Sequence, residues 1–151
     1  MTDPAFTLDG FHVEFATLAA TLADDRARGY PRMIEAGEIG AAEARHRLFV
    51  MRAIAEIWRA ATEVATPNRK LAAVTRDQCL EELAHILSGI EQRLRRRPAD
   101  RTLLHRLELL RAMRWWHAQY PERAHALNLA FMVRHDALQR QGEAGGARDA
   151  A

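Results

Sequence analysis

The segment from Thr75 to Tyr120 constrains the fold most, because it has the pattern of two helices joined by a very short turn. Thr75 and Gln78 form a capping box, and Asp77 places a negative charge near the positive end of the helix. Apolar residues then recur every three or four positions until Pro98. A turn at 98–100, with Asp100 as the next N-cap, predicts that the following helix returns antiparallel.

The same apolar spacing extends over most of the chain, and glycine or proline separates the periodic segments. Composition agrees: Ala, Leu, Arg and Glu fill 79 of 151 positions, whereas Val, Ile and Tyr number only 5, 6 and 2. Such a chain lacks the residues of a β-sandwich or barrel. We therefore predict an all-α bundle of five or six helices, over 11–27, 31–36, 41–65, 76–97, 101–120 and 121–140.

The predicted helices form one domain over residues 1–141, which begins with an irregular arm at 1–10. Residues 142–151 hold no large apolar side chain and are expected to form a mobile tail. In the 121–140 helix we expect Leu127, Ala130, Phe131 and Leu138 to point inward. The 41–65 helix has an apolar face so wide that we expect a homodimer to cover its surplus.

Charge is distributed unevenly along the chain. Residues 93–123 carry nine arginines and three acidic residues, a net charge of +6, although the whole chain has a net charge of only +2. In an antiparallel hairpin the first five of these arginines gather at the turn, and three more extend along the returning helix. Arginine binds phosphates and acidic side chains. The candidate binding residues are Arg93, Arg95, Arg96, Arg97, Arg101, Arg106, Arg111 and Arg114.

Two neighbouring tryptophans follow this basic segment. Adjacent helix residues point about 100° apart, so both cannot lie in one buried stripe. Trp116 fits the core stripe. Trp115 is expected to be partly exposed, and it joins the candidate set because aromatic rings stack on bases. A solvated surface remains the structural alternative, since arginine also favours helix C-termini.

Three Glu-x-x-His motifs are candidates for metal binding, because di-metal helical bundles use this spacing. They are Glu43-Ala44-Arg45-His46, Glu82-Leu83-Ala84-His85 and Glu122-Arg123-Ala124-His125. Glu82 and His85 fall on the predicted solvated face of their helix, and the other two glutamates open helices, where carboxylates complement the dipole. We therefore expect no metal site. The remaining histidines, including His117, show no ligand spacing.

The chain offers little for catalysis or cofactor binding. It lacks a glycine-rich phosphate loop and a nucleophile elbow, and its one serine, Ser88, lies mid-helix. The single cysteine, Cys79, lies in a helical pattern and is expected to be an inert, packed thiol. We predict a non-enzymatic cytoplasmic protein without cofactors, with neither a membrane span nor a secretory signal.

Residues 26–58 have a distinctive pattern: Arg-x-x-x-Tyr-Pro-x-x-Ile-x-x-Gly-x-Ile-x-x-x-Glu-Ala-x-x-Arg-x-x-x-Met-x-Ala-Ile-x-x-x-Trp. This segment, about a fifth of the chain, resembles one in small helical proteins encoded in bacteriophages and prophage-like regions. Within it, Gly37 is expected to adopt a left-handed turn and Ile39 to fill the gap between two helices. Gly40 stands where a Ser or Thr cap is usual. The resemblance implies a mobile-element context and no particular activity.

These patterns favour a non-enzymatic accessory protein of phage or prophage type that binds nucleic acid or a nucleoprotein partner through the arginine-rich face. An acidic protein partner would suit the same face. The alternative is a protein–protein assembly or adaptor module without nucleic-acid binding. A third alternative is a di-metal helical bundle enzyme that uses the Glu-x-x-His motifs.

Overall fold

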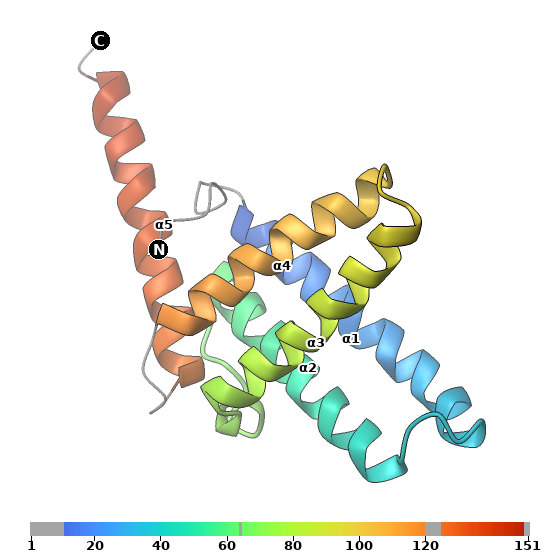
Figure 1. Cartoon of the computed structure of the whole chain (residues 1–151). Helices are drawn as coiled ribbons and strands as arrows, with labels where there is room; N and C mark the ends of the chain where they lie inside the picture. Colours follow the sequence, from blue (N-terminus) through green and yellow to red (C-terminus); the bar gives the residue numbers. More distant parts are fainter. Residues whose placement is uncertain (1–10, 64, 120–124, 150–151) are drawn as a thin grey trace.

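The computed structural model describes residues 11–63, 65–119 and 125–149 (Figure 1). These residues are helical or lie in turns and loops, and no strand occurs among them, which confirms the predicted all-α bundle. The elements are α1 (Phe11–Glu35), α2 (Ala41–Glu63), the 3-10 turn η1 (Leu71–Ala73), α3 (Arg76–Arg96), α4 (Arg101–Gln119) and α5 (His125–Asp149). The predicted arm at 1–10 and the predicted boundary at Tyr120-Pro121 lie outside the described residues.

Two antiparallel hairpins and one further helix make up the bundle. The α1–α2 pair packs against the α3–α4 pair, and α5 lies beside α2 with its C-terminal part projecting beyond the bundle (Figure 1). Helix α2 is central, since it contacts α1, α3, α5 and η1. No helix in the described part of the chain is long and apolar enough to cross a membrane.

The α3–α4 hairpin follows the local signals in its sequence. The Thr75 hydroxyl accepts a hydrogen bond from the Gln78 backbone N–H, and the Gln78 side chain accepts one from the Thr75 backbone N–H. At the turn, the Asp100 carboxylate caps α4 by accepting from the Leu103 backbone N–H at 3.1 Å. The predicted capping box and the predicted turn at 98–100 are both confirmed.

Helix α1 corrects one prediction, because it continues through the expected break at Gly29 and Pro31. Pro31 removes one backbone hydrogen bond, to the carbonyl of residue 27. The neighbouring Tyr30 side chain is buried, with 8% of its surface exposed, and a continuous helix keeps this packing. The helix ends at Glu35, and Gly37 in the following turn has a φ of 72°, which confirms the predicted left-handed turn.

Helix α5 corrects two more predictions. It continues past Gly142 to Asp149, so the predicted helix end is wrong, while the mobility of residues 142–151 stays a prediction. Its buried face is also different, since Leu127, Phe131 and Leu138 are 46%, 63% and 60% exposed. Apolar residues occupy two adjacent stripes of this helix, and spacing alone does not choose between them. Of the four expected inward residues only Ala130 is buried, and it lies with Ala126, Leu129 and Val133.

The wide apolar face of α2 is covered within the chain. Its fully buried side chains include Met51, Ile54 and Trp58, and none of the described large apolar side chains of α2 is exposed. Because α1, α3, α5 and η1 all contact this helix, the reasoning that predicted a dimer from its surplus face is wrong.

Helix α5 also completes the end of α2. The Arg134 guanidinium donates to the backbone carbonyls of Ala60 at 3.0 Å and Ala65 at 2.8 Å. A cation at this position complements the negative end of the helix dipole, and it adds to the hydrogen bond that the Ala60 carbonyl already accepts from the Ala65 backbone N–H at 3.0 Å. The backbone carbonyls of Ala60 and Ala65 are therefore both held by a side chain from α5.

Candidate functional site

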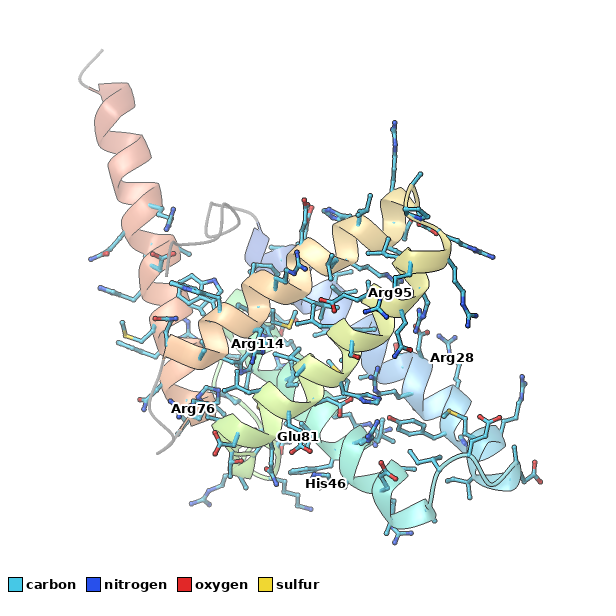
Figure 2. All side chains as sticks on the ribbon, viewed as in Figure 1. Arg28, His46, Arg76, Glu81, Arg95 and Arg114 are labelled. Carbon is cyan, nitrogen blue, oxygen red and sulfur yellow. The ribbon has the colours of Figure 1, made fainter. Side chains whose placement is uncertain are left out.

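The α3–α4 turn is the first candidate site, and its local sequence gathers five cations there. Pro98 prevents α3 from continuing, and Asp100 starts α4 directly afterwards. Figure 2 shows Arg95 beside this turn, with other side chains projecting into solvent around it. All five side chains are exposed; we call this set the basic turn, and it consists of Arg93, Arg95, Arg96, Arg97 and Arg101.

The basic turn is electrostatically uncompensated. Among the described residues, none of its five arginines forms an ion pair, whereas arginines elsewhere do: Arg26 with Glu82, Arg47 with Glu43, and Arg59 with Glu56. The negative end of the α3 dipole lies beneath the turn and offsets a fraction of one charge. The remaining positive charge faces solvent and can attract a polyanion.

Two of the other predicted binding residues, Arg111 and Arg114, do not join this turn. Figure 2 shows Arg114 toward the opposite end of α4 from Arg95, and at 1.5 Å per residue Arg114 lies roughly 20 Å along the helix from Arg101. Arg111 is exposed but pairs with Glu91 at 3.6 Å. Arg106 is half-buried and lines a groove together with His85 and with Arg93 of the basic turn, so it lies near one member of that set.

Trp115 is half-buried, in line with the predicted partial exposure, and Trp116 is buried as predicted. The two rings meet edge to face with centroids 5.2 Å apart. This contact holds the Trp115 ring against the bundle and leaves part of it open to solvent. Trp115 therefore lies on the far end of the hairpin with Arg114, away from the basic turn.

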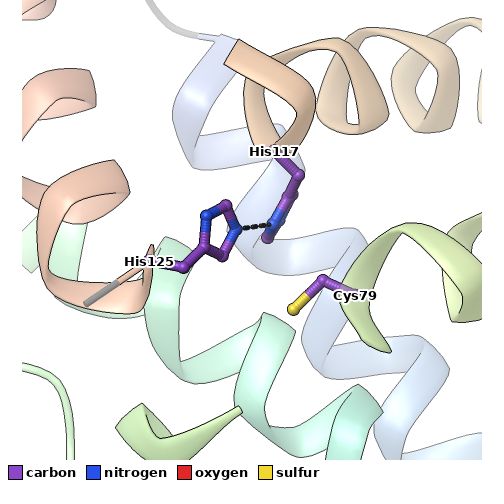
Figure 3. Close-up of side chains that lie close together, drawn as sticks. All are labelled: Cys79, His117 and His125. Carbon is purple, nitrogen blue, oxygen red and sulfur yellow. Dashed lines mark hydrogen bonds between the residues drawn. The ribbon is translucent and has the colours of Figure 1, made fainter. Parts of the chain in front are cut away.

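A second candidate site lies inside the bundle, where three helices each contribute one side chain. Cys79 of α3, His117 of α4 and His125 of α5 are 0%, 0% and 1% exposed. Their ligand atoms all lie within 4.8 Å of one another. Figure 3 shows the Cys79 sulfur directed toward the two imidazole rings, which are joined by a hydrogen bond of 2.9 Å between Nδ1 of His117 and Nε2 of His125.

The protonation of His117 follows from its neighbours. The Trp58 indole N–H can only donate, and it donates to Nε2 of His117 at 3.1 Å. Burial, with the nearby His125 as a second cause, lowers the pKa of His117 well below its ordinary value. A neutral ring that accepts at Nε2 carries its proton on Nδ1, so His117 donates to His125.

Two of the Glu-x-x-His motifs face each other across one pocket of 290 Å³ between α2 and α3. The prediction that Glu82 is solvated is wrong: it is 5% exposed and pairs with Arg26 at 3.0 Å. His85 is exposed as expected and bonds Arg47, which also pairs with Glu43. Arginines thus contact three of these four side chains, Glu43, Glu82 and His85. Among the described residues, the one group of three possible metal ligands consists of Cys79, His117 and His125.

No family model, curated protein or solved structure matches this chain. The site assignments therefore rest on the side chains themselves.

The sequence predicted the basic turn but missed the buried cluster. Cys79 was expected to be packed, and it is; its histidine neighbours were not foreseen. One signal was available, since His117 directly follows Trp116 and lies four residues after Met113, on the core stripe of α4. No local pattern indicates that Cys79 and His125 meet it there.

Proposed function

We propose that this protein is a non-enzymatic accessory protein of phage or prophage type that binds nucleic acid, alone or in a nucleoprotein, through the basic turn. One observation carries the proposal: five exposed arginines surround the turn between α3 and α4, and none has an acidic partner among the described residues. The proposal places the protein in the cytoplasm, where such a partner is found.

Phosphate contacts would supply most of the binding energy. Each arginine that neutralises a phosphate releases condensed counterions, so affinity falls as salt rises. Contacts to the backbone carry no base information, and binding is therefore expected to be independent of sequence. The turn binds first, and Arg114 with Trp115 forms a second contact roughly 20 Å away for a strand that follows α4.

The test is fluorescence anisotropy of a labelled duplex and a labelled single strand at several salt concentrations. Replacing Arg95, Arg96 and Arg97 by Ala should weaken binding on every sequence and lower the salt slope by about one unit per lost contact. The matched control removes three exposed arginines elsewhere: Arg45, Arg52 and Arg69. This control lowers the net charge by the same amount as the triple variant of the turn. The proposal is therefore supported only if the turn variant loses more affinity for nucleic acid than the control.

Trp115→Ala separates the second contact from the first. Stacking on a base is worth roughly 1–3 kcal/mol, so this variant should lose affinity for the single strand and little for the duplex. If the unmodified protein binds neither at physiological salt, the nucleic-acid proposal fails, and an acidic protein partner for the same turn takes its place.

The second candidate function is self-assembly through α5. Leu127, Phe131 and Leu138 form an exposed apolar stripe on this helix, which projects beyond the bundle (Figure 1). Spacings of four and seven residues suit a helix pair, and the same stripe of a second copy would be self-complementary. Light scattering should give twice the 17.1 kDa chain mass. Phe131→Glu should give the monomer, whereas the control Leu104→Glu on α4 should leave the dimer intact. A monomeric unmodified protein contradicts this candidate.

A further inference from the structure

The buried Cys79, His117 and His125 have the composition of a transition-metal site. Thiolate and imidazole are the ligands that Zn²⁺ and other borderline or soft ions prefer, whereas Mg²⁺ and Ca²⁺ require oxygen. The three side chains come from α3, α4 and α5 and converge on one point (Figure 3). We propose that they bind a single metal ion of the zinc class, and that the Trp58 indole limits the affinity of this site.

The distances suit a metal of this class. With the usual zinc–ligand lengths, tetrahedral geometry places neighbouring nitrogens about 3.3 Å apart and nitrogen and sulfur about 3.6 Å apart. Here the facing nitrogens of His117 and His125 are 2.9 Å apart, and all three ligand atoms lie within 4.8 Å of one another. Side-chain rotations that move each atom by less than about 1 Å therefore complete three sides of the site. The fourth position remains for water or a small ligand.

Trp58 opposes this binding through the tautomer of His117. A metal on Nδ1 displaces the proton that this nitrogen carries, and a neutral ring then holds its proton on Nε2. That N–H would face the Trp58 N–H, which now donates to Nε2 at 3.1 Å. Metal-bound histidines usually donate from their second nitrogen to an acceptor. In this protein a donor stands there instead, so the surroundings of the ligand favour the metal-free form.

The number of protons released per bound metal distinguishes two forms that the His117 ring can adopt when its Nδ1 binds the metal. If its proton moves from Nδ1 to Nε2, metal binding releases only the Cys79 thiol proton, one per metal. If the ring instead becomes an imidazolate that keeps the Trp58 hydrogen bond, His117 loses its proton as well and two are released. The proposal requires the first response.

The site is separate from the basic turn. His117 lies sixteen residues beyond Arg101 on α4, roughly 24 Å along the helix. Failure of nucleic-acid binding and failure of metal binding are therefore independent results.

The test titrates the untagged, chelator-treated full chain with Co²⁺ and then Zn²⁺, both in the native state and during refolding, because the ligands are buried. We expect one cobalt per chain with sulfur-to-cobalt charge-transfer absorption, which equimolar Zn²⁺ removes. Cys79 is the only cysteine in the chain, so this band identifies its thiolate without any mutation. A folded chain that shows no such band, or no 1:1 binding, overturns the metal site.

Variants locate the other ligands and test Trp58. His125→Gln should lose the stoichiometric binding, and the matched exposed control His46→Gln should keep it. Trp58→Phe retains a ring but removes the opposing donor, so its metal affinity should rise by about tenfold or more. Equal or weaker binding by a folded Trp58→Phe chain overturns the role of Trp58. Calorimetry of the unmodified chain in buffers of different ionisation enthalpy, below the pH at which metal-bound water ionises, gives a second measure, and release of two protons per metal under these conditions overturns that role as well.

Discussion

The two ends of the α3–α4 hairpin differ in almost every physical respect. At the turn, five arginines are exposed and without ion pairs among the described residues. At the opposite end, Cys79 and His117 are fully buried, beside Trp58 of α2 and His125 of α5. The turn is held by contacts between residues close in sequence, and the far end by contacts between distant helices. We therefore expect the stability of the fold to depend on the far end, and the binding of charged partners to depend on the turn.

The largest effect is expected at Trp58, which is fully buried and meets Phe15 edge to face with centroids 5.0 Å apart. Trp58→Ala should lower the free energy of unfolding by about 3–5 kcal/mol, because it opens a cavity and removes the donor to His117. Denaturant titration followed by circular dichroism measures the loss. A loss below about 1 kcal/mol would contradict the claim that this end carries the stability.

Next in size is Glu82, midway along the hairpin. Its carboxylate is buried and pairs with Arg26, whose side chain is 15% exposed. Glu82→Ala would leave that guanidinium without its partner, at an expected loss of about 2 kcal/mol in chemical denaturation. The neighbouring exposed Glu81 is the control, and Glu81→Ala should change stability by less than about 0.5 kcal/mol. If Glu82→Ala and Glu81→Ala lowered the free energy of unfolding equally, burial of the Glu82 carboxylate would not explain its effect.

A smaller effect is expected at Glu56, on the α2 helix outside the hairpin. The hydrogen bond from Arg59 is the main cause that lowers the pKa of Glu56, helped by the Asn68 backbone N–H and opposed by burial. The ionised Glu56 carboxylate therefore contributes fully to stability above its unfolded-state pKa of about 4.3. This contribution is lost as pH falls through the pKa of Glu56 in the folded state, which is lower. Glu56→Gln should destabilise by up to about 1 kcal/mol at pH 7, and a loss that persists below pH 3 would contradict this assignment.

The smallest effect on stability belongs to the basic turn. Replacing Arg95, Arg96 and Arg97 by Ala should change the free energy of unfolding by no more than about 0.5 kcal/mol, since these side chains are exposed and form no ion pair with any described residue. Thermal melts of the parent and the triple variant should nearly coincide. A large loss would show that the arginines pack against the bundle, and it would weaken their assignment as a binding surface.

The same contrast explains what the sequence could predict. The capping box at Thr75 and the turn at 98–100 arise from residues within a few positions of one another, and both are confirmed. The continuity of α1 and the buried face of α5 depend on packing against other helices, and both predictions were wrong. The buried cluster is the extreme case. Cys79 and His117 are 38 positions apart, and only the crossing of three helices brings them and His125 together.

The contact between Arg134 and the end of α2 has a consequence for the order in which the chain can fold. Its guanidinium binds the carbonyl of Ala60, 74 residues earlier in the sequence. During synthesis the α1–α2 hairpin can therefore form early, since its residues are close together, but the end of α2 must wait until α5 has emerged. Helix α5 thus completes a helix that is made well before it.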